Sequence, residues 1–385
     1  MLCLLRSKTE YRLGFFEVNA ILDKKTVAVA MSGGVDSSLT AALLLEQGYE
    51  VLGITMLLTE EGRSETVNVA AGEEPDCVRD ARRVADALGI ELHVADFRQA
   101  FQKNVIDYFL SEYAKGRTPN PCVICNPSMK FGLLMDKARE LGADFLATGH
   151  YARIGQLPNG RYVIKKGLDE HKDQSYALHR LPQKILSQVL LPLGDMTKEH
   201  VRELAEKMDL PVAHKAESQE ICFVPHDDYK AFLRKHKPGC LHKGNIVNDA
   251  GDVLGRHEGV PLYTIGQRKG LGIAAPEPLY VHKLDVKRNE VVVGGNKSVF
   301  ATGLLASDPN WIAIDKLEDG MEFGAKIRYG KREARAKISL QADGLLKVEF
   351  AEPQRAVTPG QFVVFYEGDV LVGGAMIEQP LSKKA

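Results

Sequence analysis

Alternating apolar and polar stretches divide the first part of the chain into strands and helices. Short apolar or β-branched runs predict buried strands, and apolar residues at helical spacing predict the helices between them. The predicted strands span residues 26–30, 50–58, 91–94 and 143–147, and the predicted helices span residues 39–45, 77–88, 97–114 and 130–141. Because strands and helices alternate, we expect an α/β fold with a doubly wound parallel sheet.

The pattern changes after residue 151. The turn sequence Pro158-Asn159-Gly160 lies between two short apolar runs and predicts a β-hairpin. Helices are predicted at 183–190 and 197–208, with a short basic helix at 228–236. Beyond Gly239, short alternating runs separated by Gly, Asn and Pro predict small β-barrels; these runs include 291–293, 325–329, 346–350 and 362–366.

These patterns divide the chain into four parts. We expect an N-terminal extension (1–24), an α/β domain (25–209), a small, mostly β central domain (210–295) and a C-terminal β-barrel (296–385). The extension has neither the apolar region of a signal peptide nor the acid-poor character of a transit peptide.

Composition excludes several classes of protein. The chain has 385 residues, of which 44% are hydrophobic and 26% charged, as is ordinary for a soluble globular protein. Its apolar runs are too short to cross a bilayer, so we expect no membrane partner. Six cysteines form no dense secreted-type framework, which favours a reducing, cytoplasmic location.

Charge gives no sign of a global attraction to nucleic acid. The net charge is −1, so an RNA partner would have to bind local basic patches. One candidate, in which alternation along a strand would bring several basic side chains to one face, contains Lys326, Arg328, Lys331, Arg332, Arg335 and Lys337. On charge alone, a solvated strand face is the favoured interpretation of this run.

The most informative stretch is Ser32-Gly33-Gly34-Val35-Asp36-Ser37-Ser38, between the first strand and the first helix. Its glycines permit close approach of a ligand, and the N–H groups at a helix start attract an anion. The loop contains no lysine, so it is not a Walker A loop. It instead resembles the phosphate loop of the N-type ATP pyrophosphatases, which cleave ATP between the α and β phosphates.

Two further stretches carry cysteines. Pro119 and Pro121 predict an extended loop that holds Cys122 and Cys125 in a Cys-x-x-Cys spacing. A zinc knuckle would need a second pair, and a thioredoxin-like pair would start a helix, so a reactive cysteine facing the nucleotide is favoured. Cys222, between apolar neighbours, would by itself be read as a buried structural cysteine.

Six motifs in order make the chain resemble the tRNA-specific 2-thiouridylases, the MnmA family. Besides the phosphate loop they are Asn-Pro-x-x-x-Cys-Asn, Ala-Thr-Gly-His-Tyr-Ala, Lys-Asp-Gln-Ser-Tyr, Ser-Gln-Glu-Ile-Cys-Phe and Tyr-Thr-Ile-Gly-Gln-Arg-Lys-Gly-Leu-Gly. The resemblance covers roughly residues 25–366. It implies ATP-dependent 2-thiolation of the wobble uridine of tRNA, in which AMP is transferred to the C2 oxygen before sulfur attacks C2.

The resemblance also implies roles for individual residues. Cys125 would be the catalytic cysteine, and Cys222 would carry a persulfide that Cys125 resolves through a transient disulfide. Residues implied to bind ATP are Ala30, Met31, Ser32, Gly33, Gly34, Val35, Asp36, Ser37, Met56 and Gly149. Residues implied to contact tRNA are Asn120, Pro121, Cys122, His150, Lys172, Asp173, Gln174, Arg328, Tyr329 and Gln361.

The chain departs from the family pattern at two places. Cys122 stands where an aspartate is usual, and Leu57 and Leu58 follow Met56 where a basic residue and a tryptophan are usual. The first departure leaves a second mechanism open, in which Cys122, Cys125 and Cys222 ligate a [4Fe–4S] cluster whose fourth iron holds hydrosulfide.

The expected cofactors are therefore ATP with Mg²⁺, and in the second mechanism the cluster. The expected partners are tRNA and a persulfide donor, such as a cysteine desulfurase or a sulfur-relay protein. Two other functions remain possible at this stage: an ATP ligase resembling argininosuccinate synthase, and a non-catalytic RNA-binding protein.

Overall fold

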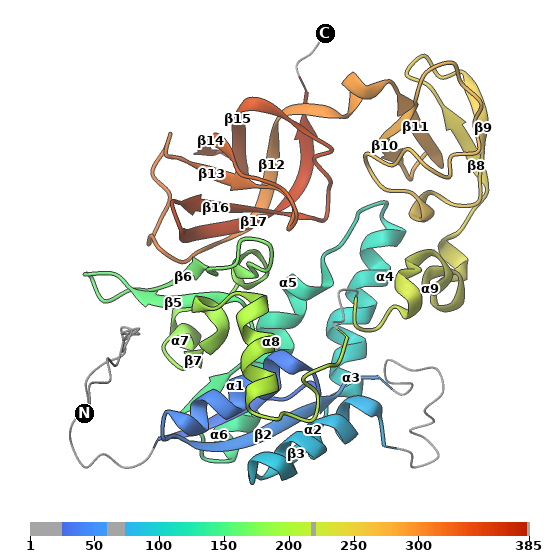
Figure 1. Cartoon of the computed structure of the whole chain (residues 1–385). Helices are drawn as coiled ribbons and strands as arrows, with labels where there is room; N and C mark the ends of the chain where they lie inside the picture. Colours follow the sequence, from blue (N-terminus) through green and yellow to red (C-terminus); the bar gives the residue numbers. More distant parts are fainter. Residues whose placement is uncertain (1–24, 60–73, 217–220, 383–385) are drawn as a thin grey trace, which may run out of the picture.

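The computed structural model of the chain describes residues 25–59, 74–216 and 221–382. The predicted extension (1–24) and the Ser218-Gln219-Glu220 part of one motif lie outside the described residues. The described residues form three units in sequence order: an α/β domain, a central β domain and a C-terminal barrel (Figure 1).

A five-stranded parallel sheet forms the core of the first domain. Its strand order is β3-β2-β1-β4-β7, from β1 (Thr26–Ala30), β2 (Glu50–Leu57), β3 (Leu92–Asp96), β4 (Phe145–Ala147) and β7 (Val189–Leu190). On β1, Val29 packs in one cluster with Ala81 of α2 (Asp76–Leu88), whereas Ala28 packs with Leu134 of α6 (Leu134–Glu140). Because neighbouring side chains on a strand face opposite ways, helices cover both faces, and the doubly wound sheet is confirmed.

Two of the helices are longer than a single α-helical segment. The π-helical stretch η2 (Gln102–Ile106) joins α3 (Arg98–Phe101) to α4 (Asp107–Ala114), so the predicted helix 97–114 is confirmed as one continuous element. The similar stretch η3 (Asn126–Leu133) joins α5 to α6. The remaining helices are α1 (Val35–Glu46), α5 (Pro121–Cys125), α7 (Gln183–Leu186), α8 (Lys198–Lys207) and α9 (Tyr229–His236).

Three predicted helices have clearly different bounds. The helix predicted at 39–45 begins at Val35. The helix predicted at 130–141 begins at Pro121, and the helix predicted at 183–190 ends at Leu186. Val189 and Leu190 instead form β7, which pairs with Leu146 and Ala147 of β4. The hydrogen bonds of a neighbouring strand override a local helical pattern here, and no local pattern encodes them.

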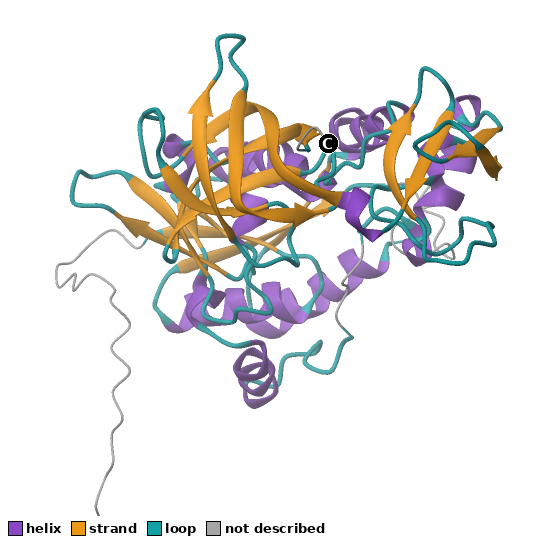
Figure 2. Ribbon diagram, turned by 90° about the horizontal axis from the view of Figure 1, so that it is seen from above, coloured by secondary structure: helices purple, strands orange, loops and turns teal. Residues whose placement is uncertain are grey.

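The central domain contains a four-stranded sheet in the order β10-β11-β8-β9. Its strands are β8 (Gly244–Val247), β9 (Val253–His257), β10 (Tyr280–Asp285) and β11 (Glu290–Gly294). Figure 2 shows this small sheet beside the larger barrel. The mostly β character predicted for this part of the chain is confirmed.

Six strands close into the predicted C-terminal barrel, because β12 pairs with both β15 and β17. They are β12 (Phe300–Trp311), β13 (Glu322–Lys326), β14 (Ala334–Leu340), β15 (Leu346–Arg355), β16 (Phe362–Glu367) and β17 (Val370–Leu381). The strand predicted at 325–329 ends at Lys326, and a turn follows. The predicted hairpin, β5 (Ala152–Gln156) with β6 (Tyr162–Lys166), extends the barrel sheet at β17.

Candidate active site

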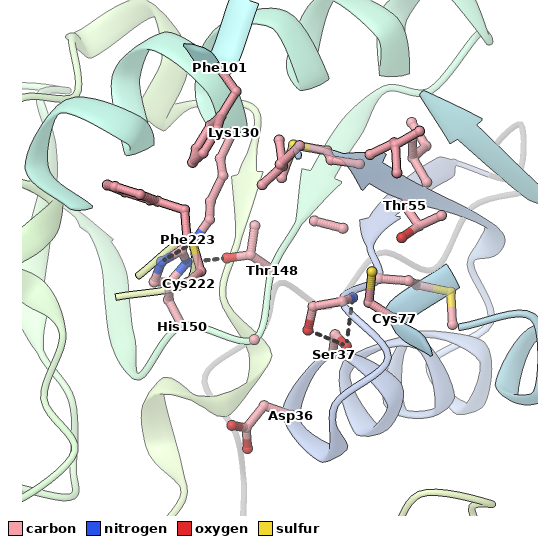
Figure 3. Close-up of a pocket in the computed structure, with 18 of the residues that line it drawn as sticks. Asp36, Ser37, Thr55, Cys77, Phe101, Lys130, Thr148, His150, Cys222 and Phe223 are labelled. Atoms are coloured by element: carbon pink, nitrogen blue, oxygen red, sulfur yellow. Dashed lines mark hydrogen bonds between the residues drawn. The ribbon is translucent and has the colours of Figure 1, made fainter. Parts of the chain in front are cut away.

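One pocket lies at the carboxyl ends of the central parallel strands, where ligands of such sheets bind (Figure 3). It collects residues from the phosphate loop, the end of β2, the end of β4 and the segment of Cys222. Its lining is Ala30, Met31, Ser32, Asp36, Ser37, Ile54, Thr55, Met56, Leu57, Leu58, Thr59, Cys77, Phe101, Lys130, Thr148, Gly149, His150, Gln174, Cys222 and Phe223. The ends of β1, β2 and β4 therefore contribute to one pocket.

The phosphate loop is held in shape by its own hydroxyl groups. Ser37 Oγ accepts a hydrogen bond from the backbone N–H of Ser32 at 3.2 Å and lies 3.3 Å from Ser32 Oγ. Ser38 Oγ donates to the carbonyl of Gly34 at 2.8 Å. No side chain caps the start of α1. The first N–H groups of this helix lie at the pocket and have no side-chain acceptor. They can therefore bind an anion.

Two glycines of the site are required by close approach of the backbone. Gly33 has φ +69°, and a Cβ there would lie 2.6 Å from the carbonyl oxygen of Cys77. A Cβ on Gly149 would lie 2.9 Å from Cβ of Asp36. At Gly34, by contrast, the nearest atom to a Cβ is Ser32 Oγ at 3.5 Å. The space above Gly34 is thus left open by the protein itself.

Two lysines distant in sequence contact the loop, and each is paired with a carboxylate. Lys198 Nζ lies 2.6 Å from Asp36 Oδ1, which also accepts from the hydroxyl of Tyr151 at 2.7 Å. Lys215 Nζ donates to the carbonyl of Gly33 at 2.9 Å and pairs with Asp80 at 2.5 Å. Sequence reasoning missed both lysines, because neither belongs to a motif around the loop.

The Cys-x-x-Cys pair begins a helix, so the prediction of an extended loop was wrong at these residues. Residues 117–120 are non-helical, but α5 starts at Pro121 with Asn120 in the N-cap position. Proline is well tolerated at the first helical position, because its missing N–H would have no partner there. Cys122 is exposed on this turn, and Cys125 is buried.

The two cysteines expected to exchange sulfur are associated with one apolar cluster. Cys125 is 9% exposed and belongs to a buried cluster against which Cys222 packs. Phe223 of the same cluster is 7% exposed and makes edge-to-face contacts with Phe101 and Phe109. Cys222 also lines the pocket, whereas Cys125 does not. The cluster therefore shields the thiols from water on the side away from the pocket.

Burial controls the charge of Cys125. It raises the pKa of the Cys125 thiol to about 12, although the ammonium of Lys130 acts in the opposite direction and the other two cysteines add to the rise. Cys125 is therefore a neutral thiol at pH 7 in the protein alone.

The raised pKa leads to a prediction about reactivity with pH. Because the thiolate is the nucleophile, the rate of Cys125 alkylation should rise about tenfold per pH unit from pH 7 to pH 10. A thiol with an ordinary pKa near 8.5 would level off by about pH 9.5. Iodoacetamide labelling followed by peptide mass spectrometry measures this, with a cysteine peptide as reference. A plateau of the Cys125 rate at the same pH as the peptide would contradict the prediction.

His150 is a neutral hydrogen-bonding group at the end of β4. Burial, reinforced by the charge of Lys130, lowers its pKa well below the usual value. Lys130 Nζ lies 3.4 Å from Nε2, and Thr148 Oγ1 lies 2.6 Å from Nδ1 (Figure 3). Since the ammonium can only donate, Nε2 accepts and Nδ1 donates to the threonine hydroxyl. Lys130 is thereby directed into the pocket.

Several residues expected to contact tRNA make hydrogen bonds inside the protein. Asp173 is buried and accepts from the N–H groups of Gly167 and Ser175, at 3.0 and 3.1 Å. Gln174 lines the pocket and accepts from the N–H of Tyr151 at 3.0 Å. The hydroxyl of Tyr329 donates to the carbonyl of Lys172 at 3.5 Å.

The predicted basic run does not form one strand face. Lys326 ends β13 and lies 3.8 Å from Asp173, while Arg335 pairs with Glu322 and Glu367. Arg328 donates to the carbonyls of Ile265 and Ala356 and to Thr358 Oγ1, at 3.3, 2.9 and 2.6 Å. Lys331 and Arg332 lie exposed on the turn after β13.

Within the described residues, no three His, Cys, Asp or Glu side chains are arranged to hold a metal ion. Among the helices of the same residues, none has the length and apolar character needed to cross a membrane.

Comparisons with known proteins match nearly the whole chain. Three family models match: tRNA methyl transferase HUP domain (residues 25–226), tRNA methyl transferase PRC-barrel domain (230–295) and aminomethyltransferase beta-barrel domain (301–377). The tRNA-specific 2-thiouridylase MnmA of Pelotomaculum thermopropionicum is 49% identical over 362 residues, which are 93% of this chain and 98% of that protein. The protein of the same name from Carboxydothermus hydrogenoformans is 50% identical over 367 residues, 94% and 100% of the two chains.

A solved structure of more distant similarity was also found. It is a 4-thiouridine synthetase in complex with RNA and bound ATP, with 18% identity and a TM-score of 0.34. The match covers 56% of this chain and 51% of that chain.

Proposed function

The chain belongs to the tRNA-specific 2-thiouridylase family, and we propose that it uses ATP to replace the C2 oxygen of the tRNA wobble uridine with sulfur. The observation that carries the proposal is that one pocket is lined by both the phosphate loop and Cys222. A site for activating an oxygen and a site for delivering sulfur are thus adjacent.

The first step is activation of the uracil C2 oxygen, which is otherwise a poor leaving group. The loop from Ser32 to Ser37 and the N-terminus of α1 would hold the phosphates of ATP. The C2 oxygen attacks the α-phosphorus, the bond to the β-phosphate oxygen breaks, and pyrophosphate leaves. Lys198 and Lys215, paired with Asp36 and Asp80, hold the loop in shape, and Lys130 supplies an ammonium in the lining of the pocket.

The second step transfers sulfur. A donor protein first places a persulfide on Cys222. The terminal sulfur attacks C2, and AMP leaves with the former C2 oxygen. Cys125 then gives its thiol proton to a phosphate oxygen of AMP or to water, and its sulfur attacks the inner sulfur of Cys222, so that the S–S bond breaks and the terminal sulfur stays on C2. A Cys125–Cys222 disulfide results, and a dithiol must reduce it before the next turnover.

The cofactor requirements follow from the same geometry. Because the described residues offer no group of three acidic or His and Cys ligands, Mg²⁺ would be bound mainly by phosphate oxygens and water, as this ion prefers. We propose the persulfide route rather than a [4Fe–4S] cluster, since Cys125 and Cys222 share one buried apolar cluster; iron and sulfide analysis after anaerobic purification tests this choice. Family membership sets aside the ligase and the non-catalytic alternatives.

The proposed function is tested by incubating the protein with unmodified tRNA, ATP, Mg²⁺ and a persulfide donor. Mass spectrometry of the digested tRNA should show a uridine in which sulfur replaces oxygen, formed with one AMP and one pyrophosphate per thiolated base. Omission of ATP serves as the control. Formation of ADP and phosphate instead would contradict adenylation, and a methylated base would contradict sulfur transfer.

A further inference from the structure

The segment that leads into the Cys-x-x-Cys helix is held by the C-terminal barrel. The backbone N–H of Thr118 donates to the carbonyl of Pro359 at 2.9 Å. The side-chain amide of Gln361 donates to the carbonyls of Thr118 and Pro119, at 3.0 and 3.2 Å. Pro359 and Gln361 therefore hydrogen-bond to the backbone just before α5, more than two hundred positions earlier in the sequence.

Arg117 adds an ionic connection between the same two parts. Its Nε lies 2.6 Å from Glu112 of α4, and its Nη1 lies 2.5 Å from Glu378 of β17. Nη2 donates to the carbonyl of Ile377 at 3.3 Å. The side chains of Arg117 and Glu112 are 18% and 7% exposed, so solvent screens this network weakly. Hydrogen bonds from Arg117 and Ser307 outweigh the burial of Glu378 and lower its pKa.

The backbones also meet closely here. Gly360 has φ +88°, and a Cβ on it would lie 3.0 Å from Cβ of Arg117 and from the N of Thr118. A glycine thus lets the barrel loop lie directly on the segment before α5. The two backbone segments therefore pack directly against each other, in addition to the hydrogen bonds made by the side chains.

We propose that Arg117, Gln361 and Glu378 form a clamp through which the barrel positions Cys125 for the sulfur step. Cys125 ends the short helix that begins at Pro121, immediately after the clamped segment. A rotation or shift of that segment is therefore passed to the thiol. The inference rests on the proposed function. It assigns a positioning role to Gln361, because the amide nitrogen of its side chain donates to the carbonyls of Thr118 and Pro119.

The clamp is tested in the full-length protein with Glu378→Gln and Gln361→Ala, both checked for an unchanged melting temperature. Glu333→Gln is the matched control. Glu333 is also a barrel carboxylate paired with a base, Lys166 of β6, at 2.7 Å, and its side chain is 26% exposed against 29% for Glu378. Glu333 makes none of the contacts to residues 117–120 described above.

Two readouts are needed. The first is the rate of Cys125 alkylation without substrates, relative to Cys240 in the central domain. It should rise about fivefold in both clamp variants, because loss of the clamp loosens the helix that carries Cys125 within its buried cluster. The second is steady-state thiolation, in which kcat should fall about tenfold while KM for tRNA stays within about twofold.

The two readouts distinguish the clamp from tRNA binding by Gln361 and from general loosening of the barrel. A raised KM for tRNA with unchanged kcat and unchanged Cys125 alkylation would show that Gln361 binds tRNA and would overturn the clamp. Equal effects in Glu333→Gln would show general loosening of the barrel, which also overturns it. Because alkylation needs no tRNA or ATP, faster Cys125 labelling supports the clamp even if the proposed function fails.

Discussion

Replacing Cys222 with serine is expected to lower the rate of tRNA thiolation by roughly a thousandfold or more, because the variant cannot carry a persulfide. Cys125→Ser should be equally severe in multiple turnover, since the persulfide sulfur could not be released from Cys222. Both variants should still bind ATP, because neither side chain is part of the phosphate loop. The measurement is sulfur incorporation into tRNA, with ATP binding followed separately.

Cys122→Ala is the matched control for this prediction. Cys122 is the exposed member of the pair and has no step in the persulfide mechanism, so most activity should remain. The resting protein should also be colourless and free of iron after anaerobic purification. If iron and activity were lost together when any one of Cys122, Cys125 and Cys222 was replaced, the three would be cluster ligands and the persulfide mechanism would be wrong.

Replacing Gly34 with valine is expected to weaken ATP binding by about a hundredfold or more, because the added methyl groups would occupy the space of a phosphate. The fold should tolerate this change. Gly34 has an ordinary negative φ of −107°, and a Cβ there would be 3.5 Å from its nearest neighbour. The melting temperature should therefore change by no more than about 3 °C. Isothermal titration with a non-hydrolysable ATP analogue measures the binding.

Two other glycines serve as controls. Gly33→Val should destabilise the fold by about 2–4 kcal/mol, because Gly33 has a positive φ and the new Cβ would meet the carbonyl of Cys77. Gly48→Ala, at the far end of α1, should cost about 1 kcal/mol and leave ATP binding unchanged. Normal ATP affinity in a folded Gly34→Val protein would show that the phosphates bind elsewhere.

The sequence by itself determined the architecture and which stretches of the chain lie at the strand ends that form the site. Apolar strand patterns alternating with helical spacing predicted the parallel sheet, because side-chain periodicity is a property of neighbouring residues. The glycine loop before α1 and the stretch Thr148-Gly149-His150 after β4 could be placed at strand ends for the same reason. The short runs beyond Gly239 predicted β structure, and β12 and β17 indeed close a barrel.

Local signals misled where two rules competed. The prolines around Cys122 predicted an extended loop, but Pro121 occupies the one helical position where proline loses no hydrogen bond. Val189 and Leu190 fitted a helical pattern, yet pairing with β4 made them a strand. The first outcome depended on the position of the proline in the helix, and the second on the strand with which the backbone paired.

Only the tertiary structure decided how distant residues complete the site. It brings Lys198 and Lys215 to a loop that has no lysine of its own, packs Cys222 against the cluster of Cys125, and sets Gln361 on the segment before α5. These contacts join segments whose separation in sequence carries no periodic signal. They exist because closing the sheet and the barrel buries apolar surface, and that burial is a property of the whole chain rather than of any stretch of it.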